Sequence, residues 1–467
     1  MPVRIEHDFL GEMEIANDVY YGIQTLRAVD NFPISGQPIS NCPELIAALG
    51  YVKKAAALAN MELGAIPAPI GQAICQACDD LIAGRFLDQF PVDCIQGGAG
   101  TSTNMNANEV IANRALELLG HPKGDYAHCH PNNHVNCSQS TNDVYPTAFR
   151  LALHQTLGGL GEALEYVLAG FAAKGEEFAD VIKMGRTQLQ DAVPMTLGQE
   201  FNAYAVTIGE DVCRLQEARS LLLEINLGAT AIGTGINSRP GYSRLSTQAL
   251  RDLTCLDLAT SPNLIEATWD TGAYVQLSGV LKRIAVKLSK ICNDLRLLSS
   301  GPRTGLGEIN LPRMQPGSSI MPGKVNPVIP EVMNQVAFDI IGKDVTITMA
   351  AESGQLELNV MEPIIAHCLF TGIARLSRTC RVLRDRCVDG ITANRDHCRG
   401  LVARSIGLVT ALNPVIGYEM SAALAKEAME TGESVYELVL RKGVLTQEQL
   451  DELLLPENMM QPRFVQG

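Results

Sequence analysis

Apolar side chains recur at intervals of three and four residues through the middle of the chain, with charged side chains between them. The clearest run covers about residues 273–298. This period is that of one face of an α-helix, and a helix of this length extends about 40 Å at 1.5 Å per residue. Because other helices have to cover the apolar face, the pattern predicts a helical bundle. Its apolar positions are Leu277, Val280, Leu281, Ile284, Leu288, Ile291, Leu295 and Leu298.

Four further segments are predicted as long helices, at about 143–175, 195–225, 328–352 and 362–389. Two helix starts are predicted where a capping side chain precedes a proline, at Ser261-Pro262 and Asn326-Pro327. A third start is predicted at the capping box of Thr446 with Gln449. Alternating strand patterns are sparse, so we predict an all-α fold.

Two polar, turn-rich stretches, residues 121–136 and 389–400, interrupt the helical pattern. Residues of this kind favour surface connections over packed elements. We therefore predict three domains: a mostly helical N-terminal domain over residues 1–140, a central domain of long bundled helices over 141–394, and a small helical C-terminal domain over 395–467.

Charge and composition exclude several classes of protein. The net charge is −14, from 37 basic and 51 acidic residues, and no run is rich in Lys or Arg. This argues against nucleic acid as a partner, because its binding needs clustered cations. No uncharged apolar run reaches the ~18 residues of a membrane span, and no secretory signal precedes the 13 scattered cysteines. We expect free thiols in a reducing cytoplasm.

Several segments partly resemble phosphate-binding or metal-binding motifs but do not match them. The segment from Gly317 to Lys324 has one residue too many between its glycines for a phosphate-binding loop, and Val325 stands where that loop has Ser or Thr. Cys75 and Cys78 have no second pair at zinc spacing, so we interpret them as thiols on a helix. A polar surface loop accounts for His128, Cys129, His130 and His134 as well as a metal would. We predict neither a metal nor a cofactor site.

Four flexible stretches between helical segments are rich in uncharged hydrogen-bonding side chains. They are GGAGTSTNMNANE (97–109), SQSTND (138–143), GRTQLQDA (185–192) and GSSIMPGKVNP (317–327). Glycine allows such a backbone to bend sharply and to approach a ligand closely. On composition alone these stretches fit either helix-capping loops or parts of a binding site, and both interpretations stay open.

Together the four stretches resemble the aspartase/fumarase superfamily, whose most specific motif is GSSIMPGKVNP. The similarity extends from RIEHDFLGE near the start of the chain to TQEQLDELL near its end. Within the superfamily, MGRTQLQDAVPMTLGQEF and GQLELNVMEPI resemble the aspartase branch. Fumarases typically have SSND where this chain has STND, and His where it has Gln188.

The resemblance implies a three-domain fold whose central helices assemble into the helical core of a homotetramer, with each active site shared by three subunits. It also implies a lyase that converts L-aspartate reversibly to fumarate and ammonia without an organic cofactor. The reaction removes a proton next to the β-carboxylate and passes through a dianionic enediolate. It therefore needs a positioned base and donors directed at the carboxylate oxygens.

The resemblance assigns roles to individual residues. Ser318 is the base, with its oxygen stabilised by Gly317, Ser319 and the N–H groups that follow. The loop around Ser318 closes over substrate as a lid, with Gly317, Ile320, Met321 and Gly323 in it. Thr187, Lys324 and Asn326 bind the α-carboxylate. Thr101, Ser140, Thr141 and Ser319 bind the β-carboxylate, and Thr101 and Asn142 meet the amino group. Gln188 orients substrate but cannot relay a proton, because an amide does not titrate.

Three alternatives remain beside the aspartase interpretation. One is a fumarase-type hydratase, which the glutamine at position 188 disfavours. Another is a lyase that acts on a substituted aspartate. The third is a catalytically silent structural member of the superfamily, which the intact Ser318, Lys324 and Asn326 disfavour. An assay with L-aspartate, L-malate and no substrate distinguishes the aspartase, the hydratase and the silent member.

Overall fold

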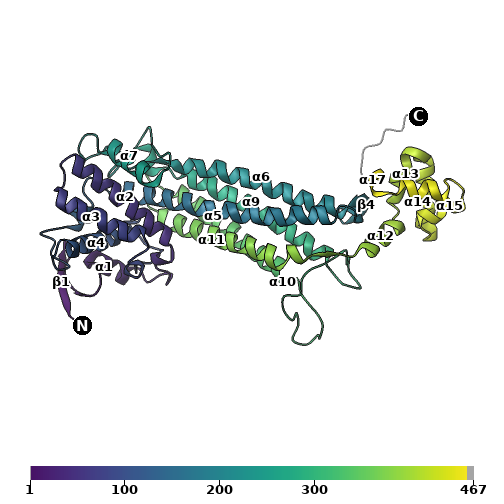
Figure 1. Cartoon of the computed structure of the whole chain (residues 1–467), viewed down its shortest axis with the longest axis horizontal. Helices are drawn as coiled ribbons and strands as arrows, with labels where there is room; N and C mark the ends of the chain where they lie inside the picture. Colours follow the sequence, from purple (N-terminus) through teal and green to yellow (C-terminus); the bar gives the residue numbers. More distant parts are fainter. Residues whose placement is uncertain (1, 460–467) are drawn as a thin grey trace. The chain divides into compact units, whose positions relative to one another are not determined.

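A computed structural model of the chain describes residues 2–459 and is mostly helical, with four small two-stranded sheets (Figure 1). The predicted all-α class is confirmed. The chain forms two compact units. Unit 1 comprises Met1–Gly161, Cys213–Arg283 and Phe338–Leu376; unit 2 comprises Glu162–Val212, Ile284–Ala337 and Ser377–Gly467. The three-domain division stays a prediction, and residues 460–467 of its last domain lie outside the described residues.

Short helices and two small sheets make up much of unit 1. The strands β1 (Val3–Asp8) and β2 (Gly11–Ala16) pair as an antiparallel hairpin, and β5 (Glu224–Ile225) pairs in parallel with β6 (Ala259–Thr260). The helices are α1 (Ile23–Asn31), α2 (Pro43–Glu62), α3 (Ala68–Ile82), α4 (Thr101–Leu118), α7 (Tyr242–Thr254) and α8 (Glu266–Trp269). A single π-helical turn, Pro131–Val135, follows α4.

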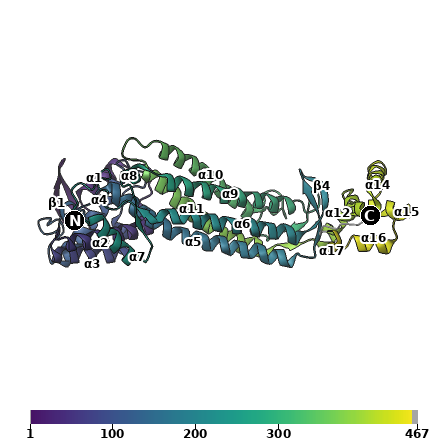
Figure 2. The ribbon, with the colours of Figure 1, turned by 90° about the horizontal axis from the view of Figure 1, so that it is seen from above.

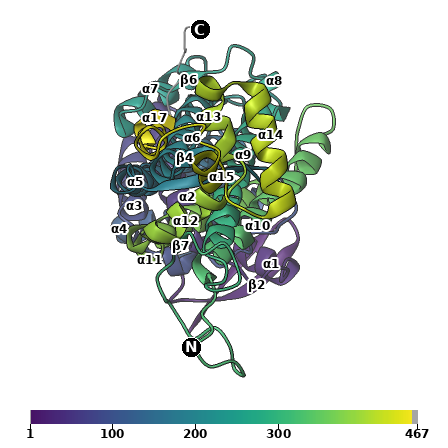
Figure 3. The ribbon, with the colours of Figure 1, turned by 90° about the vertical axis from the view of Figure 1, so that its right-hand side faces the viewer.

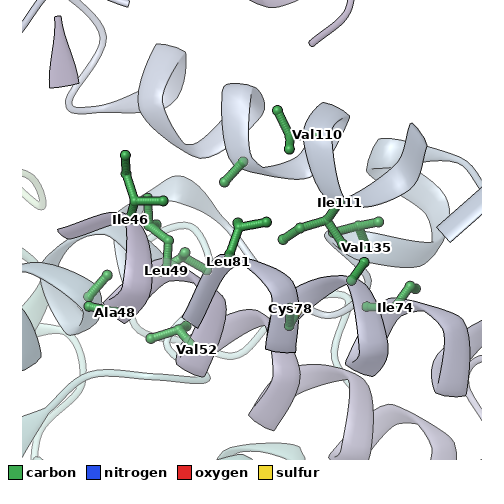
Figure 4. Close-up of a cluster of buried hydrophobic side chains, with 14 of the residues drawn as sticks. Ile46, Ala48, Leu49, Val52, Ile74, Cys78, Leu81, Val110, Ile111 and Val135 are labelled. Atoms are coloured by element: carbon green, nitrogen blue, oxygen red, sulfur yellow. The ribbon is translucent and has the colours of Figure 1, made fainter. Parts of the chain in front are cut away.

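The core of unit 1 lies where α2, α3 and α4 pack together (Figure 4). Leu49 of α2, Leu81 of α3 and Ile111 of α4 are fully buried there. Cys78 is also in this core and Cys75 packs against it, which confirms their interpretation as thiols on a helix. All thirteen cysteines of the chain are free.

Five long helices contribute residues to both units: α5 (Thr141–Glu177), α6 (Leu197–Ser220), α9 (Gly272–Leu298), α10 (Val328–Glu352) and α11 (Glu362–Arg386). Within each unit their stretches lie side by side (Figures 1 and 2). All five predicted helices are confirmed. The segment predicted to end at 225 leaves the α-helix after Ser220, and the one predicted to end at 389 leaves it after Arg386.

Two of the three predicted helix starts need correction. No helix begins at Pro262: the Asn263 side chain accepts hydrogen bonds from the N–H groups of Ile265 and Glu266, so α8 begins only at Glu266. Near Pro327, α10 begins at Val328, and the Asn326 amide donates to a loop carbonyl instead of capping the helix. The capping box of Thr446 with Gln449 is confirmed.

Unit 2 adds an antiparallel hairpin, β3 (Ile182–Thr187) with β4 (Gln190–Thr196), and the strand pair β7 (Ile309–Asn310) with β8 (Thr392–Ala393). Its C-terminal helices are α12 (Arg395–Arg404), α13 (Leu408–Ile416), α14 (Tyr418–Thr431), α15 (Val435–Arg441), α16 (Gln447–Leu453) and α17 (Pro456–Met459). Helices α13, α14 and α15 gather together (Figure 3). They share a core with Ile182 and Met184 of β3.

None of the helices within residues 2–459 combines the length and the apolar character that a membrane crossing requires.

Candidate active site

The loop 317–327, which precedes α10 in unit 2, is closed by hydrogen bonds between its two ends. Gly317 N donates to Lys324 O at 2.9 Å, and Asn326 Nδ2 donates to Gly317 O at 2.7 Å. A Cβ atom on Gly317 would lie 2.4 Å from Lys324 O. Only glycine allows this approach, so residue 317 closes the loop because it lacks a side chain. In Figure 1 the segment before α10 extends away from the helices of unit 2.

The Ser318 hydroxyl oxygen faces backbone donors from its own loop. Ser318 Oγ accepts hydrogen bonds from Met321 N at 3.0 Å and from Ile320 N at 3.2 Å. The expected donors were Gly317, Ser319 and the N–H groups that follow. The two donors observed are among those that follow, whereas Gly317 N donates to Lys324 O instead. The Ile320 side chain is 82% exposed. Two N–H dipoles directed at one oxygen favour a negative charge on that oxygen.

The remaining polar residues of the loop lie at the surface. Lys324 is exposed and has no ion-pair partner within residues 2–459, so its ammonium is available to an anion. Ser319 is also exposed. The Asn326 amide nitrogen is already used to hold Gly317, which leaves its Oδ1 atom and the backbone for other contacts.

Thr187 and Gln188 lie at the exposed tip of the β3–β4 hairpin. The turn between the strands has φ values of +55° at Gln188 and +63° at Leu189, the left-handed geometry of a tight two-residue hairpin. The hairpin is held by the buried Glu308 carboxylate, just before β7. Arg186 Nη1 lies 2.6 Å from Glu308 Oε1, and Lys183 Nζ lies 3.1 Å from its Oε2. Lys183 also pairs with Glu200 at 2.5 Å.

Thr101 begins α4 in unit 1, after a strained turn. Gly98, Ala99 and Gly100 all have positive φ, at +89°, +57° and +89°. A Cβ on Gly100 would lie 2.4 Å from the Tyr145 ring of α5, so glycine is required where α4 starts beside α5. The Thr101 side chain is exposed, and its Oγ1 donates to Gly98 O at 2.7 Å.

Ser140, Thr141 and Asn142 form the entry to α5, beside the entry to α4. Asn104 Nδ2 of α4 donates to Thr141 Oγ1 at 3.1 Å. Asn142 N donates to Ser140 Oγ at 3.2 Å, and Asn142 Nδ2 donates to Ala231 O at 2.8 Å. Two helix entries rich in hydroxyl and amide groups are therefore brought together, and N-terminal helix ends favour anions.

The Asp143 carboxylate holds the entry to α5 in place through hydrogen bonds to the backbone. It accepts hydrogen bonds from Ser140 N at 2.9 Å and from Gly228 N and Thr230 N at 3.0 Å each. Burial raises the pKa of Asp143 to about 6, although these three donors oppose the shift. The carboxylate thus joins the 226–233 segment to the first turn of α5.

A buried amine supports the same region. Lys53 Nζ of α2 donates to Asn136 Oδ1 and to Gln139 Oε1, both at 2.9 Å. Asn136 Oδ1 also accepts from Asn104, the residue that holds Thr141. Burial lowers the pKa of Lys53 to about 7.

The sequence did not indicate the supporting residues. Lys53 lies in an apolar stretch of α2, and its partners are more than 80 positions away along the chain. Glu308 lies 122 positions from Arg186. Asn104 lies inside a stretch that was singled out, but the pattern did not distinguish it from its neighbours. Asp143 belongs to the STND motif, which was the one available signal.

The predicted site residues divide between the two units. Unit 1 brings together one group, Thr101 with Ser140, Thr141 and Asn142. Unit 2 holds two further groups, the hairpin tip with Thr187 and Gln188 and the loop with Ser318, Ser319, Lys324 and Asn326. Within residues 2–459 no hydrogen bond joins these two groups. Within the described residues, the loop's side chains form hydrogen bonds only inside the loop. Within the loop itself, an exposed ammonium and a hydroxyl under two N–H groups are groups that can hold an anion.

Comparison with known proteins supports the sequence resemblance. Residues 11–342 match the family model described as Lyase, and residues 408–461 match the model described as Fumarase C C-terminus. The aspartate ammonia-lyase of Pseudomonas aeruginosa is 61% identical over 99% of this chain and 98% of its own length. That of Helicobacter pylori strain 26695 is 60% identical over 98% of both chains.

The fold comparison agrees. A crystal structure described as fumarate lyase:delta crystallin from Brucella melitensis bound to cobalt has a TM-score of 0.96 and 57% identity, covering 99% of this chain and 100% of that one. Fold, motifs and sequence similarity thus define a helical lyase. The chain belongs to the aspartase/fumarase superfamily and, within it, to the aspartate ammonia-lyase family of carbon–nitrogen lyases.

Proposed function

We propose that this protein catalyses the reversible elimination of ammonia from L-aspartate to give fumarate, with Ser318 as the base. The observation that carries the proposal is the pair of backbone N–H groups, from Ile320 and Met321, directed at Ser318 Oγ. A serine hydroxyl is a very weak acid, so it acts as a base only if its alkoxide is stabilised. Fixed N–H dipoles supply that stabilisation without reorganisation during the reaction.

The reaction needs hydrogen-bond donors that stabilise the negative charge of the enediolate, and uncharged hydroxyl groups can do this. The Ser318 alkoxide takes a proton from the carbon next to the β-carboxylate, whose oxygens then carry the charge of an enediolate. Thr101, Ser140, Thr141 and Ser319 are proposed to donate to these oxygens, for which the Thr101 hydroxyl has to turn its hydrogen away from Gly98 O. Hydrogen bonds from these hydroxyl groups strengthen as negative charge builds up on the carboxylate oxygens. They therefore stabilise the transition state more than the substrate. Collapse of the enediolate then breaks the C–N bond.

The α-carboxylate and the amino group are assigned to other residues. Lys324 is proposed to bind the α-carboxylate, with Thr187 and Asn326 beside it, because its ammonium is exposed and unpaired within residues 2–459. Thr101 and Asn142 are proposed to accept hydrogen bonds from the amino group. Gln188 can orient the substrate but cannot transfer a proton. A hydratase that needs a titrating group at this position is therefore the weaker alternative.

The proposed site is completed by assembly into a homotetramer in which three chains contribute to each site. An apolar stripe on α10 supports this: Phe338, Val345 and Met349 are 62%, 57% and 66% exposed, and their spacing places them on one helical face. Large exposed apolar groups in such a row are typical of a helix covered by a partner.

The loop 317–327 is proposed to close over bound substrate, with Gly317 and Gly323 as flexible points. The thirteen free thiols suit work in the cytoplasm.

The test follows the ultraviolet absorbance of fumarate after addition of L-aspartate, L-malate or buffer. We expect a rise with L-aspartate alone; a rise with L-malate would establish the hydratase, and no rise with either would establish the silent member.

Ser318→Ala should lower kcat by at least about 10³-fold, because general-base catalysis and the alkoxide's electrostatic stabilisation are lost together. Ser353→Ala, at an exposed hydroxyl that donates to Met349 O, is the matched control. Near-normal turnover in Ser318→Ala with intact helicity would contradict the proposal.

A further inference from the structure

Three potential metal ligands converge on the surface of unit 1, in the loop between α4 and the π-helical turn. His121 Nδ1 lies 3.5 Å from Asp125 Oδ2, and His128 Nε2 lies 3.7 Å from the same oxygen. All three ligand atoms lie within 4.8 Å of one another. Of the four residues that the sequence had singled out nearby, only His128 belongs to this group. Cys129 is buried, and the Nδ1 atoms of His130 and His134 each accept a backbone N–H.

We propose that His121, Asp125 and His128 bind a divalent transition-metal ion such as Zn²⁺, Co²⁺ or Ni²⁺. Tetrahedral ligands at about 2.1 Å from an ion are separated by about 3.4 Å. The two distances to Asp125 Oδ2 are therefore already close to those a bound ion needs. Two imidazoles with one carboxylate select these metals over Mg²⁺ and Ca²⁺, which prefer oxygen ligands alone. Water completes the coordination, because the three side chains are 33%, 33% and 52% exposed.

Among the described residues, the Asp125 carboxylate pairs with the two imidazoles and with no lysine or arginine. Lys123 is the only basic residue of the loop besides its histidines, and its ammonium is directed elsewhere. It donates to Asp18 O at 2.9 Å and lies over the Tyr20 ring. Within the described residues, Asp125 has no ion-pair partners except His121 and His128.

The backbone that carries the ligands is anchored on both sides of Asp125. Gly124 N donates to Asn113 Oδ1 of α4 at 2.7 Å, and Asn113 Nδ2 donates to the Tyr126 hydroxyl at 3.2 Å. Next to His128, the Cys129 side chain is fully buried. The loop therefore presents its ligands from a fixed backbone, which reduces the entropy lost when an ion binds.

Binding requires one local rearrangement. The rings of His121 and His128 are stacked, with centroids 3.7 Å apart and planes 14° from parallel. Because the lone pair of a ring nitrogen lies in the ring plane, the two rings must splay apart to reach a single ion. Both side chains are partly exposed and can rotate without disturbing the core.

The experiment is titration of the metal-free full-length protein with CoCl₂, followed by equilibrium dialysis and visible absorption. We expect one Co²⁺ per chain at this site, with d–d bands and without the ultraviolet sulfur-to-cobalt band that binding to the thiols would produce. Asp125→Asn and His128→Ala should each weaken binding by at least about ten-fold, since even residues that only support a ligand contribute 10–100-fold. His7→Gln, at an exposed histidine of β1 outside the group, is the control and should bind normally.

Two outcomes overturn the proposal. If wild-type protein binds no more Co²⁺ than Asp125→Asn and His128→Ala, the three residues form only surface ion pairs. If equimolar Mg²⁺ displaces the cobalt, the metal class is wrong. The readout is binding and not turnover, so its result is independent of the proposed lyase activity.

Discussion

Lys53 carries an amine into the interior of unit 1, where no solvent reaches it. Its two hydrogen-bond acceptors, Asn136 Oδ1 and Gln139 Oε1, match the two N–H groups of a neutral amine, whereas an ammonium has three. Burial lowers its pKa from 10.5 to about 7, although the nearby Asp143 carboxylate opposes the shift. The residue that supports Thr141 through Asn136 and Asn104 is therefore one whose charge changes near neutral pH.

This pKa predicts a pH-dependent stability. Between about pH 7 and 10.5 the unfolded chain binds more protons at Lys53 than the folded chain does, so the free energy of unfolding rises with pH. Relative to Lys53→Met, the wild-type protein should gain up to about 1.4 kcal/mol per pH unit across this window, and no further gain is expected above it.

Urea unfolding at pH 7, 8, 9 and 10 and at fixed protein concentration measures this difference. Lys54→Met is the matched control, because the amine of the neighbouring Lys54 bonds to Asp79, whose side chain is largely exposed. Parallel stability profiles for wild type and Lys53→Met would show that Lys53 is charged in the folded protein throughout this range.

At the scale of elements, Glu308 joins the β3–β4 hairpin to the strand β7 that precedes the serine loop. Its side chain is fully buried between Lys183 and Arg186. Removing one partner of a buried ion pair leaves the others uncompensated in a region of low dielectric, which costs about 3–5 kcal/mol. Glu308→Gln keeps the size of the side chain and removes only its charge.

We therefore expect Glu308→Gln to lower the free energy of unfolding by about 3 kcal/mol, measured by urea unfolding near neutral pH. The matched control is Asp180→Asn. Asp180 pairs with Arg395 at 2.7 Å but is 75% exposed, so its loss should change the free energy of unfolding far less than Glu308→Gln does. Equal effects of the two substitutions would mean that burial does not strengthen the Glu308 contacts.

The elements also show how far sequence reasoning reaches. The helix predicted at 273–298 is observed as Gly272–Leu298, because 27 residues repeat one apolar period. The β3–β4 hairpin was missed, since its left-handed turn is made by Gln188 and Leu189 and not by the Gly or Asn that usually marks such turns. At Ser261-Pro262 the local signal did not decide the helix start, because the Asn263 side chain two residues later accepts the N–H groups of Ile265 and Glu266.

In the candidate site, too, some residues could be predicted from the sequence and others could not. The residues proposed to touch substrate belong to contiguous motifs, so they were visible in the sequence. Lys53, Asn136 and Glu308 act through partners that are 83 or 122 positions away, and no local pattern records such pairings. The folded chain supplies these contacts, which determine how firmly the motif residues are held.

At the scale of the whole molecule, the proposed site residues are distributed over two units, with Thr141 in unit 1 and Ser318 in unit 2. If each site is shared among three chains, these two residues reach one substrate from different copies of the chain. This arrangement makes a quantitative prediction for mixed oligomers, because each copy brings both residues but uses them in different sites.

Ser318→Ala and Thr141→Ala proteins, each inactive alone, should regain activity when they are dissociated together in urea and reassembled at equal amounts. A site needs an intact Ser318 from one chain and an intact Thr141 from another. Random assembly supplies each with a probability of one half, so about a quarter of the wild-type rate should return. Mixing without dissociation is the control and should give no activity, and fumarate absorbance measures the rate. If reassembled mixtures stay inactive while wild-type protein recovers from the same treatment, Ser318 and Thr141 of a site come from one chain. The proposal that these two residues belong to different chains then fails, even if the oligomer is a tetramer.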